Sequence, residues 1–256
     1  MKFLNLLFLI LGQIIFAQNV TNTLKADFKT KSKDALYSYI NFDGEGNADI
    51  SGYNTYPYFE RNDSVVILVD KSAFVLKKVK NELVGVSDWI EGNKYKSNLK
   101  QLNSVPQTNQ ELLKKAELYS DYYTTNYIKV ANLFTDELNE DVYEKMMDQL
   151  IQNNDNLCKR DLDLGCIQLF SLKMTKEMGG VSAALNLSED FVFKPNKYFE
   201  DLGQKVINLG NPQGYGLLAS YYTLTRDKQK ADEMVEKGIE EGCELCLTIA
   251  LQNSED

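Results

Sequence analysis

The spacing of hydrophobic and polar positions changes near residue 106. Before this point, short runs alternate apolar side chains with polar or small ones, as strands with one buried face do. These runs are Ala35–Phe42, Ala48–Tyr53, Val65–Val69, Ala73–Val79 and Leu83–Ile90. Turn-forming residues separate them, for example Asp43-Gly44-Glu45-Gly46-Asn47. The pattern predicts a small β-domain, a meander of about five or six antiparallel strands.

After Gln107 the apolar residues recur every three or four positions, which is the period of an α-helix. Asn109–Phe134 follows this spacing, and Asn139–Gln152 repeats it, with Asn139 as the expected N-cap. We therefore expect a β-rich domain over residues 19–106 and an α-helical domain over 107–256. The predicted fold class is α+β.

The helical half contains a repeated pattern. Three segments begin with Gly165-Cys166, Gly214-Tyr215 and Leu245-Cys246, and each has an aliphatic residue a few positions later. Asp227 is suited to an N-cap, and Gly210 and Gly242 are suited to end helices. Helical hairpins at the spacing of these two glycines predict an α-solenoid.

Leu218-Ala219-x-x-Tyr222, Asp227-x-x-Lys230-Ala231 and Gly242 resemble the Sel-one-like repeat, a relative of the tetratricopeptide repeat. The resemblance is clearest over residues 209–250 and weaker over 155–208. It implies a tetratricopeptide-like solenoid that offers a protein- or peptide-binding surface and acts as a scaffold or adaptor. Cys158 and Cys166 are similar to a pair in the cysteine-rich secreted members, so the resemblance implies a disulfide between them.

Cys243 and Cys246 form a Cys-x-x-Cys pair whose role the sequence leaves open. The alternatives are a structural disulfide, two unpaired thiols, a redox site at a helix N-terminus, or a zinc site built from all four cysteines. We favour a structural disulfide or unpaired thiols, because no strand–helix context of the thioredoxin type surrounds the pair.

The first residues have the layout of a secretory signal peptide. Lys2 precedes an apolar run that starts at Phe3, and Ala17-Gln18 follows it. We expect residues 1–18 to be removed and the mature chain to be periplasmic or extracellular; an uncleaved membrane anchor is the alternative. All four cysteines follow this segment, and in an exported chain an even number favours disulfides. No later apolar stretch of the sequence has membrane-spanning length.

Charge and composition narrow the function classes. Residues 107–256 contain 15 Lys and Arg against 26 Asp and Glu. This acidity argues against nucleic acid and anionic lipid as partners and is compatible with a basic protein partner, or simply with solubility. The chain has no histidine, which removes the commonest general base and transition-metal ligand. We therefore expect no enzyme, metal or cofactor; the alternative is a cell-envelope hydrolase using carboxylates such as Asp141 and Glu144, or Asp161 and Asp163.

Tyr53, Tyr56, Tyr58 and Phe59 surround Pro57, and Trp89 is the only tryptophan. If exposed, these side chains would form a stacking platform for a sugar or a peptide. If buried, they belong to the core of the β-domain, and small β-domains need aromatic side chains inside. The core interpretation is favoured, and the binding platform is kept as the alternative.

The resemblance also implies a binding surface in the helical half. In tetratricopeptide-like solenoids the first helix of each hairpin lines the concave side. In the hairpin that starts near Gly214, we expect Leu218 and Ala219 to be buried. Gln213 and Ser220 or Tyr221 are then expected to face outward as candidate binding residues.

Overall fold

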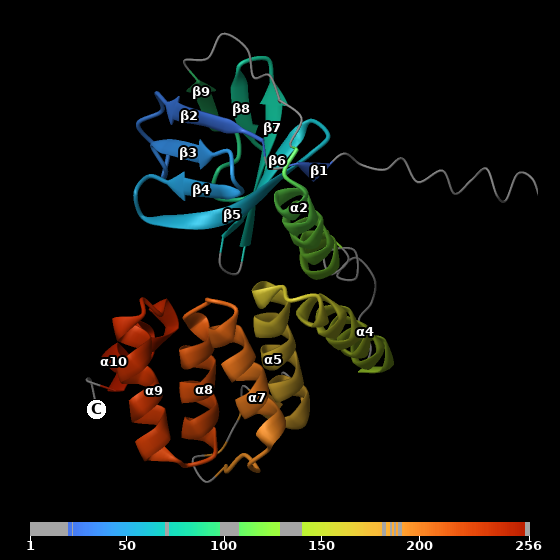
Figure 1. Cartoon of the computed structure of the whole chain (residues 1–256), viewed down its shortest axis with the longest axis vertical. Coiled ribbons are helices and arrows are strands. Elements are labelled where there is room, and N and C mark those ends of the chain that lie inside the picture. Colours follow the sequence, from blue (N-terminus) through green and yellow to red (C-terminus); the bar gives the residue numbers. More distant parts are fainter. Residues whose placement is uncertain are drawn as a thin grey trace, which may run out of the picture. The chain divides into compact units, whose positions relative to one another are not determined.

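The computed structural model describes residues 20–21, 23–69, 72–97, 108–128, 140–180, 183–184, 186, 188 and 191–253 (Figure 1). The chain divides into two compact units, Met1–Tyr127 and Ile128–Asp256. The predicted signal peptide, residues 1–18, lies outside the described residues.

The first unit is a closed antiparallel β-barrel. Its strands are β1 (Val20–Thr21), β2 (Lys25–Thr30), β3 (Tyr39–Asp43), β4 (Asn47–Ile50), β5 (Asn54–Arg61), β6 (Ser64–Val69), β7 (Ser72–Val79), β8 (Glu82–Gly85) and β9 (Lys94–Ser97). The sheet order is β1-β5-β4-β3-β2-β9-β8-β7-β6, and β6 also pairs with β5. Each strand from β2 to β9 thus pairs with the next along the chain, and the pairing of β2 with β9 closes these eight strands into a ring, to which β1 adds a short pairing with β5.

The predicted meander of five or six strands is therefore wrong. β2, β5 and β9 lie outside the predicted runs. β5 was interpreted only as an aromatic cluster around Pro57, and β2 and β9 each have only one large apolar residue, Phe28 or Tyr95, between charged or polar neighbours. In so short a strand one inward aromatic side chain is enough, because its neighbours point to the opposite face. β2 and β9 pair with each other, so missing them also hid the closure of the ring.

The barrel interior is filled by its own side chains. Inward positions of the strands supply a single apolar cluster that includes Phe28, Ile40, Phe42, Ile50, Tyr58, Ile67, Phe74, Leu76, Leu83 and Tyr95. An eight-stranded barrel has an interior just wide enough for such side chains. The barrel is therefore a packed core with two covered ends.

One helix packs on the outside of the barrel. α2 (Gln110–Tyr123) begins at Asn109, whose side chain accepts hydrogen bonds from two backbone N–H groups of the first turn, and the π-helix η1 (Thr124–Ile128) follows it. Phe59 points outward from β5 and is buried, with its ring 6.0 Å from that of Tyr123. α2 therefore lies in the first compact unit, although its period had assigned it to the helical half.

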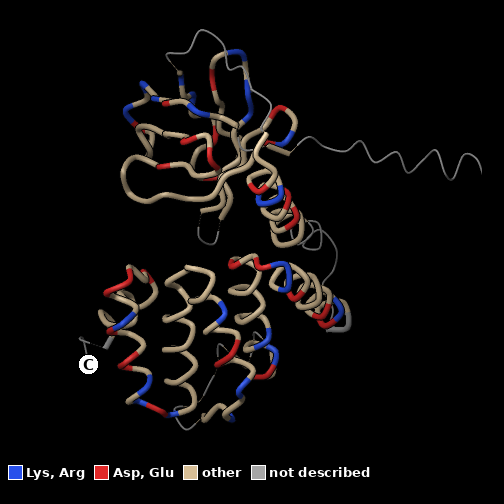
Figure 2. The backbone as a smooth tube through the Cα atoms, viewed as in Figure 1, with Lys and Arg blue, Asp and Glu red and all other residues tan. Residues whose placement is uncertain are grey.

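The second unit is helical. Its described long helices are α4 (Glu140–Lys159), α5 (Asp163–Glu177), α7 (Lys197–Asn208), α8 (Gln213–Leu224), α9 (Lys228–Glu240) and α10 (Glu244–Asn253). α8 carries no charged residue and contacts α7, α9 and α10 (Figure 2). None of the helices in the described ranges combines the length and the apolar composition needed to cross a membrane.

The predicted solenoid is also wrong, while the broader α+β class holds. A solenoid repeats one unit, and each unit contacts only its neighbours. Here the described long helices range from 20 residues in α4 to 10 in α10, so they do not repeat one unit. Side chains of α5, α7 and α8 join Phe193 in one shared core.

The predicted N-cap Asp227 and the predicted helix ends are nevertheless correct, whereas Asn139, the other predicted N-cap, lies outside the described residues. The Asp227 carboxylate accepts a hydrogen bond from the Lys230 N–H at the start of α9. Gly210 and Gly242 follow α7 and α9 with φ of 84° and 83°. The starts and ends of single helices are thus predictable from the sequence here, whereas the packing of the helices against one another is not.

Candidate functional site

One end of the barrel carries most of its exposed large apolar side chains. The strand directions place the β2–β3 loop (residues 31–38), the β4–β5 loop (51–53) and the β8–β9 loop (86–93) at this end, which we call the aromatic end. The exposed large apolar residues of the described first unit are Leu36, Tyr53, Val79, Val86 and Trp89. All except Val79 lie in these three loops. Such clustering marks interaction sites.

The β8–β9 loop holds Trp89 outward in a fixed conformation. Gly85 N–H donates to the Asn93 carbonyl (2.9 Å), and Gly92 N–H donates to the Gly85 carbonyl (3.0 Å). Ile90 is fully buried in the barrel core, whereas Trp89 is 70% exposed. Position 85 must be glycine, because a Cβ there would lie 1.9 Å from the Ile90 carbonyl oxygen.

Trp89 also has an unusual backbone. Its φ is 68°, in the left-handed region, which costs a residue with a Cβ about 1–2 kcal/mol. Bulky residues in this region are outliers and cluster at functional sites. The fold therefore presents its only tryptophan to solvent at a cost in stability, which directs attention to this end of the barrel.

Tyr37 lies over the mouth of the barrel at the same end. Its ring centroid is 6.3 Å from that of Tyr53 and 5.3 Å from that of Phe74. Tyr53 belongs to the β4–β5 loop and is 75% exposed, whereas Phe74 is an inward residue of β7. Tyr37 thus connects the exposed rim to the buried core.

The aromatic residues that surround Pro57 in the sequence are separated in the structure. Tyr53 is exposed, Tyr56 is half-buried against the core, and Tyr58 is fully buried inside the barrel. The candidate binding role of Tyr58 is therefore wrong, because β5 turns its side chain inward. Burial raises the pKa of Tyr58 far above its usual value, with a smaller contribution from the negative charge of Glu60, so the phenol stays protonated.

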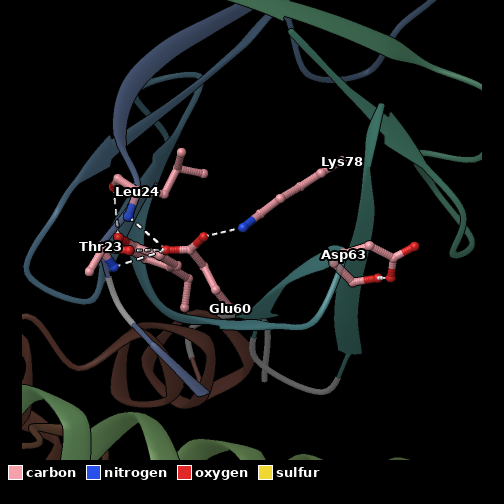
Figure 3. A network of polar contacts seen from close by, with 7 residues as sticks. Thr23, Leu24, Glu60, Asp63 and Lys78 are labelled. Atoms are coloured by element: carbon pink, nitrogen blue, oxygen red, sulfur yellow. Dashed lines mark hydrogen bonds and ion pairs between the residues drawn. The ribbon is translucent and has the colours of Figure 1, made fainter. Parts of the chain in front are cut away.

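The opposite end of the barrel, which we call the charged end, is closed by a polar network around Glu60 (Figure 3). Glu60 on β5 is 2% exposed and pairs with Lys78 on β7. One of its carboxylate oxygens accepts hydrogen bonds from the Thr23 N–H (2.9 Å), the Thr23 hydroxyl (2.9 Å) and the Leu24 N–H (2.8 Å). The Tyr58 hydroxyl donates to the Leu24 carbonyl (2.7 Å). These bonds tie the segment between β1 and β2 over this end.

Tyr221 is buried rather than outward-facing, which corrects the sequence prediction. It is 1% exposed, and its ring stacks on that of Phe199 with centroids 5.6 Å apart. Its hydroxyl oxygen accepts from the Asn196 N–H at 2.7 Å. Leu218 and Ala219 are buried, as predicted. α8 contacts α7, α9 and α10, so Tyr221 lies against other helices rather than on an open face.

The two other helical candidates are half-buried and already engaged. The Gln213 side-chain oxygen accepts a hydrogen bond from the Leu245 N–H at 3.3 Å and so joins α8 to the start of α10. The Ser220 hydroxyl donates to the Gly216 carbonyl at 2.9 Å within its own helix. The structure therefore does not bring Gln213, Ser220 and Tyr221 together on one open surface.

Both cysteine pairs lie at disulfide distance. Cys158 at the end of α4 pairs with Cys166 on α5, with Cα atoms 4.5 Å apart, in agreement with the prediction. Cys243 and Cys246 pair at the start of α10, with Cα atoms 5.3 Å apart, and both are fully buried. Gly238 packs against Cys246 so closely that a Cβ there would clash with its sulfur. Because a redox cysteine must be reachable, this burial supports a structural role.

Two of the four carboxylates of the hydrolase alternative, Asp161 and Asp163, are bound to other side chains, and the Asp141 side chain lies outside the described residues. Asp161 pairs with Lys205 at 2.9 Å, and Asp163 accepts a hydrogen bond from the Asn211 amide at 2.7 Å. Within the described ranges, no group of three or more His, Cys, Asp or Glu side chains is placed to hold a metal ion. Asp161 and Asp163 therefore serve contacts that link helices.

Sequence reasoning missed Leu36 and Val86 as surface residues because both fell within predicted strands. For Val86, the sequence did contain a signal that the strand ends before it. Ser87 and Asp88 favour turns and stand inside the predicted strand Leu83–Ile90. Glu60 was missed because a charged residue near a strand end is usually exposed. No sequence feature indicated that it faces the barrel interior.

The comparisons with known proteins give no relative. No protein-family model, no curated protein and no solved structure matches the chain. The resemblance to Sel-one-like repeats stays a prediction, and the functional argument rests on the residues of the aromatic end.

Proposed function

We propose that this chain is an exported, non-catalytic binding protein and that the aromatic end of its barrel contacts a protein or peptide partner. The observation that carries the proposal is the gathering of Leu36, Tyr53, Val86 and Trp89, all at least half exposed, at one end of the barrel. Tryptophan and tyrosine dominate the binding energy of protein interfaces.

The packed interior favours contact at the rim. The inward side chains form one continuous apolar cluster, so the barrel has no room for a bulky ligand. The rim loops lie outside this cluster. A partner would therefore bind across the loops.

The position of the two most exposed aromatic side chains favours a protein over a sugar. Tyr53 lies in the β4–β5 hairpin and Trp89 in the β8–β9 hairpin, on opposite sides of the ring of strands. A stacking platform for one sugar ring needs neighbouring aromatic faces. A protein surface can reach both hairpins at once.

Two observations support export. Residues 1–18 have the sequence layout of a signal peptide, and two cysteine pairs lie at disulfide distance. The acidity of residues 107–256 would favour a basic partner if the partner also contacts the second unit. In that case the affinity should fall as salt concentration rises.

The test uses the mature chain, residues 19–256, as bait in the native envelope and secreted fractions. Tyr53→Ser with Trp89→Ser removes the two aromatic side chains of the rim. The matched control is Val79→Ser, because Val79 is an exposed apolar residue in the same unit but outside the aromatic end.

We expect the double variant to weaken capture of a specific partner roughly 30-fold or more, as the loss of an interface hot spot does. The Val79→Ser control should keep it. A partner that binds the double variant and the control equally well would contradict the proposal. If many proteins are captured and none of them is lost in the double variant, the capture is non-specific adsorption, which also contradicts the proposal.

A further inference from the structure

Tyr95 on β9 has a buried hydroxyl that lacks a hydrogen-bond partner in the described part of the chain. Its side chain is 0% exposed and belongs to the barrel core. Leaving such a hydroxyl unpaired costs about 1–3 kcal/mol. Tyr58, the other fully buried tyrosine of the barrel, donates to the Leu24 carbonyl. A phenylalanine would fill the place of Tyr95 without this cost.

Tyr37 packs on the core at the aromatic end, the end of the barrel at which β9, the strand of Tyr95, begins. It packs against the core cluster to which Tyr95 belongs, and its ring contacts Phe74 in the same cluster. Tyr37 is close enough to contribute to the raised pKa of Tyr95, although burial is the larger cause. The half-buried Tyr37 ring therefore lies between solvent and the core cluster that contains Tyr95.

The loop that carries Tyr37 is weakly held. In the described structure no hydrogen bond involves residues 33–37, and the loop is fastened at its end by the Ser38 N–H, which donates to the Ser51 hydroxyl oxygen. The β8–β9 loop at the same end is closed by several backbone hydrogen bonds. Segments with few hydrogen bonds open at low free energy. Tyr37 can thus move away while Trp89 stays in place.

We infer that the aromatic end contains a small-molecule site in which a flat, neutral ligand replaces the Tyr37 ring and accepts a hydrogen bond from the Tyr95 hydroxyl. This site goes beyond the proposed contact with a protein partner and does not depend on it. The ligand uses the space that Tyr37 vacates, because the remaining interior is filled.

The surroundings define the chemistry of the ligand. The vacated space has the size of one phenol ring, and its walls are apolar side chains of the core cluster, including Phe74. The ligand needs one acceptor, such as a carbonyl, because the pKa of Tyr95 is raised to about 12 and its hydroxyl remains a donor at neutral pH. A charged ligand is disfavoured, because an unpaired charge is costly to remove from water.

Two probes separate the hydrogen bond from simple apolar burial. Acetophenone has one aromatic ring and one carbonyl, and ethylbenzene has a similar shape without the acceptor. Because Trp89 is the only tryptophan, growth on 5-fluorotryptophan gives one fluorine signal that reports on the rim of the site. Its shift is followed while each probe is titrated into the full mature protein.

We expect the fluorine signal to shift saturably with acetophenone. Tyr95→Phe should weaken acetophenone binding roughly five-fold, the value of one hydrogen bond, and leave ethylbenzene binding unchanged. Tyr37→Ala should tighten the binding of both probes, because no ring has to be displaced. Tyr58→Phe, which removes the other buried hydroxyl, should change the affinity of neither probe.

The absence of saturable binding in both the mature protein and Tyr37→Ala would overturn the inference. An equal loss for both probes in Tyr95→Phe would also overturn it, since the hydroxyl would then act only through packing. If Tyr37→Ala does not fold, Tyr37→Leu provides a smaller covering side chain for the same comparison. Partner capture is measured separately on Tyr95→Phe, whose rim is intact, so failure of this site and failure of the proposed function are distinguishable.

Discussion

The two ends of the barrel are closed in different ways. At the charged end, Glu60 has a partner for each of its oxygens, and Lys78, Thr23 and Leu24 converge on it. At the aromatic end, side-chain packing by Tyr37 takes the place of such bonds, and the hydroxyl of Tyr95 stays unpaired. The charged end is thus fixed by directional polar contacts, whereas the aromatic end is covered by aromatic side chains whose packing allows several orientations.

This difference assigns the two roles to different ends of the barrel: the charged end stabilises the fold, and the aromatic end is available for binding. A buried ion pair that accepts further hydrogen bonds has one favourable arrangement, so the charged end should be rigid. Apolar rings have many arrangements of similar energy. In natural proteins, unfavourable local features concentrate at functional sites and are compensated elsewhere in the structure. The aromatic end has two such features, the unpaired buried hydroxyl of Tyr95 and the positive φ of Trp89.

The largest expected effect is that of Glu60→Gln at the charged end. The substitution keeps the shape but leaves Lys78 partly buried without its counter-ion, so the barrel should lose about 3 kcal/mol of unfolding free energy. Urea unfolding followed by Trp89 fluorescence reports on this unit. Asp63→Asn is the control, since Asp63 pairs with Lys77 at the exposed surface and should change stability by less than about 0.5 kcal/mol. Equal effects of the two variants would remove the distinction between the ends.

The second prediction compares the two buried tyrosines. Tyr58→Phe removes a donor from the Leu24 carbonyl and should lower the unfolding free energy by about 1–2 kcal/mol. Tyr95→Phe removes a hydroxyl that has no partner and should leave stability unchanged or raise it. Both are measured by the same urea titration. A larger loss for Tyr95→Phe than for Tyr58→Phe would show that the Tyr95 hydroxyl is paired.

The third prediction concerns the left-handed residue of the rim. Trp89→Gly should raise the stability of the barrel by up to about 1 kcal/mol, because glycine adopts a positive φ without steric cost. The same variant should lose partner capture. Trp89→Ala, which keeps a Cβ, is the control and should lose capture without the gain in stability. Because neither variant keeps the only tryptophan, urea unfolding is followed by circular dichroism, and a stability loss in Trp89→Gly would mean that the indole contributes to packing.

The smallest effect is expected in the loop that carries Tyr37. Leu36 is exposed, and Leu36→Ser should change the unfolding free energy by no more than about 0.5 kcal/mol. Hydrogen exchange is the sharper measurement. Amides of residues 33–37 should exchange fast, and those of Gly85, Gly92 and Asn93 slowly, because only the latter donate hydrogen bonds. Equal protection of the two loops would rule out a movable cover.

Local signals explain how much of the fold was predictable. Asp227 was recognised as a helix start because a capping side chain acts within three residues of the chain. The positions of β6 and β7 were recognised because several buried residues alternate in each. The closure of the barrel depends on the pairing of β2 with β9, and no periodicity within either strand records a partner so distant in sequence.

The candidate site was predictable only in part. Tyr53 and Trp89 were singled out as aromatic residues, but their exposure follows from turns that end the strands before them. Tyr58 and Tyr221 were placed on binding surfaces and are buried, since their orientation depends on the packing of β5 and of α8. Side-chain direction is a tertiary property, and the residue types alone do not determine it.

The pairing of β2 with β9 has a consequence for the order of folding. The ring closes only when Phe28 meets Ser97, so a long loop must be ordered before this contact forms. In the second unit, α4 contacts α5 and α8 contacts α9, each the next long helix along the chain. Contacts between distant residues form slowly, and contacts between near neighbours form fast. We expect the helical unit to acquire its structure first during refolding and the barrel to set the overall rate, although the barrel precedes it in the chain.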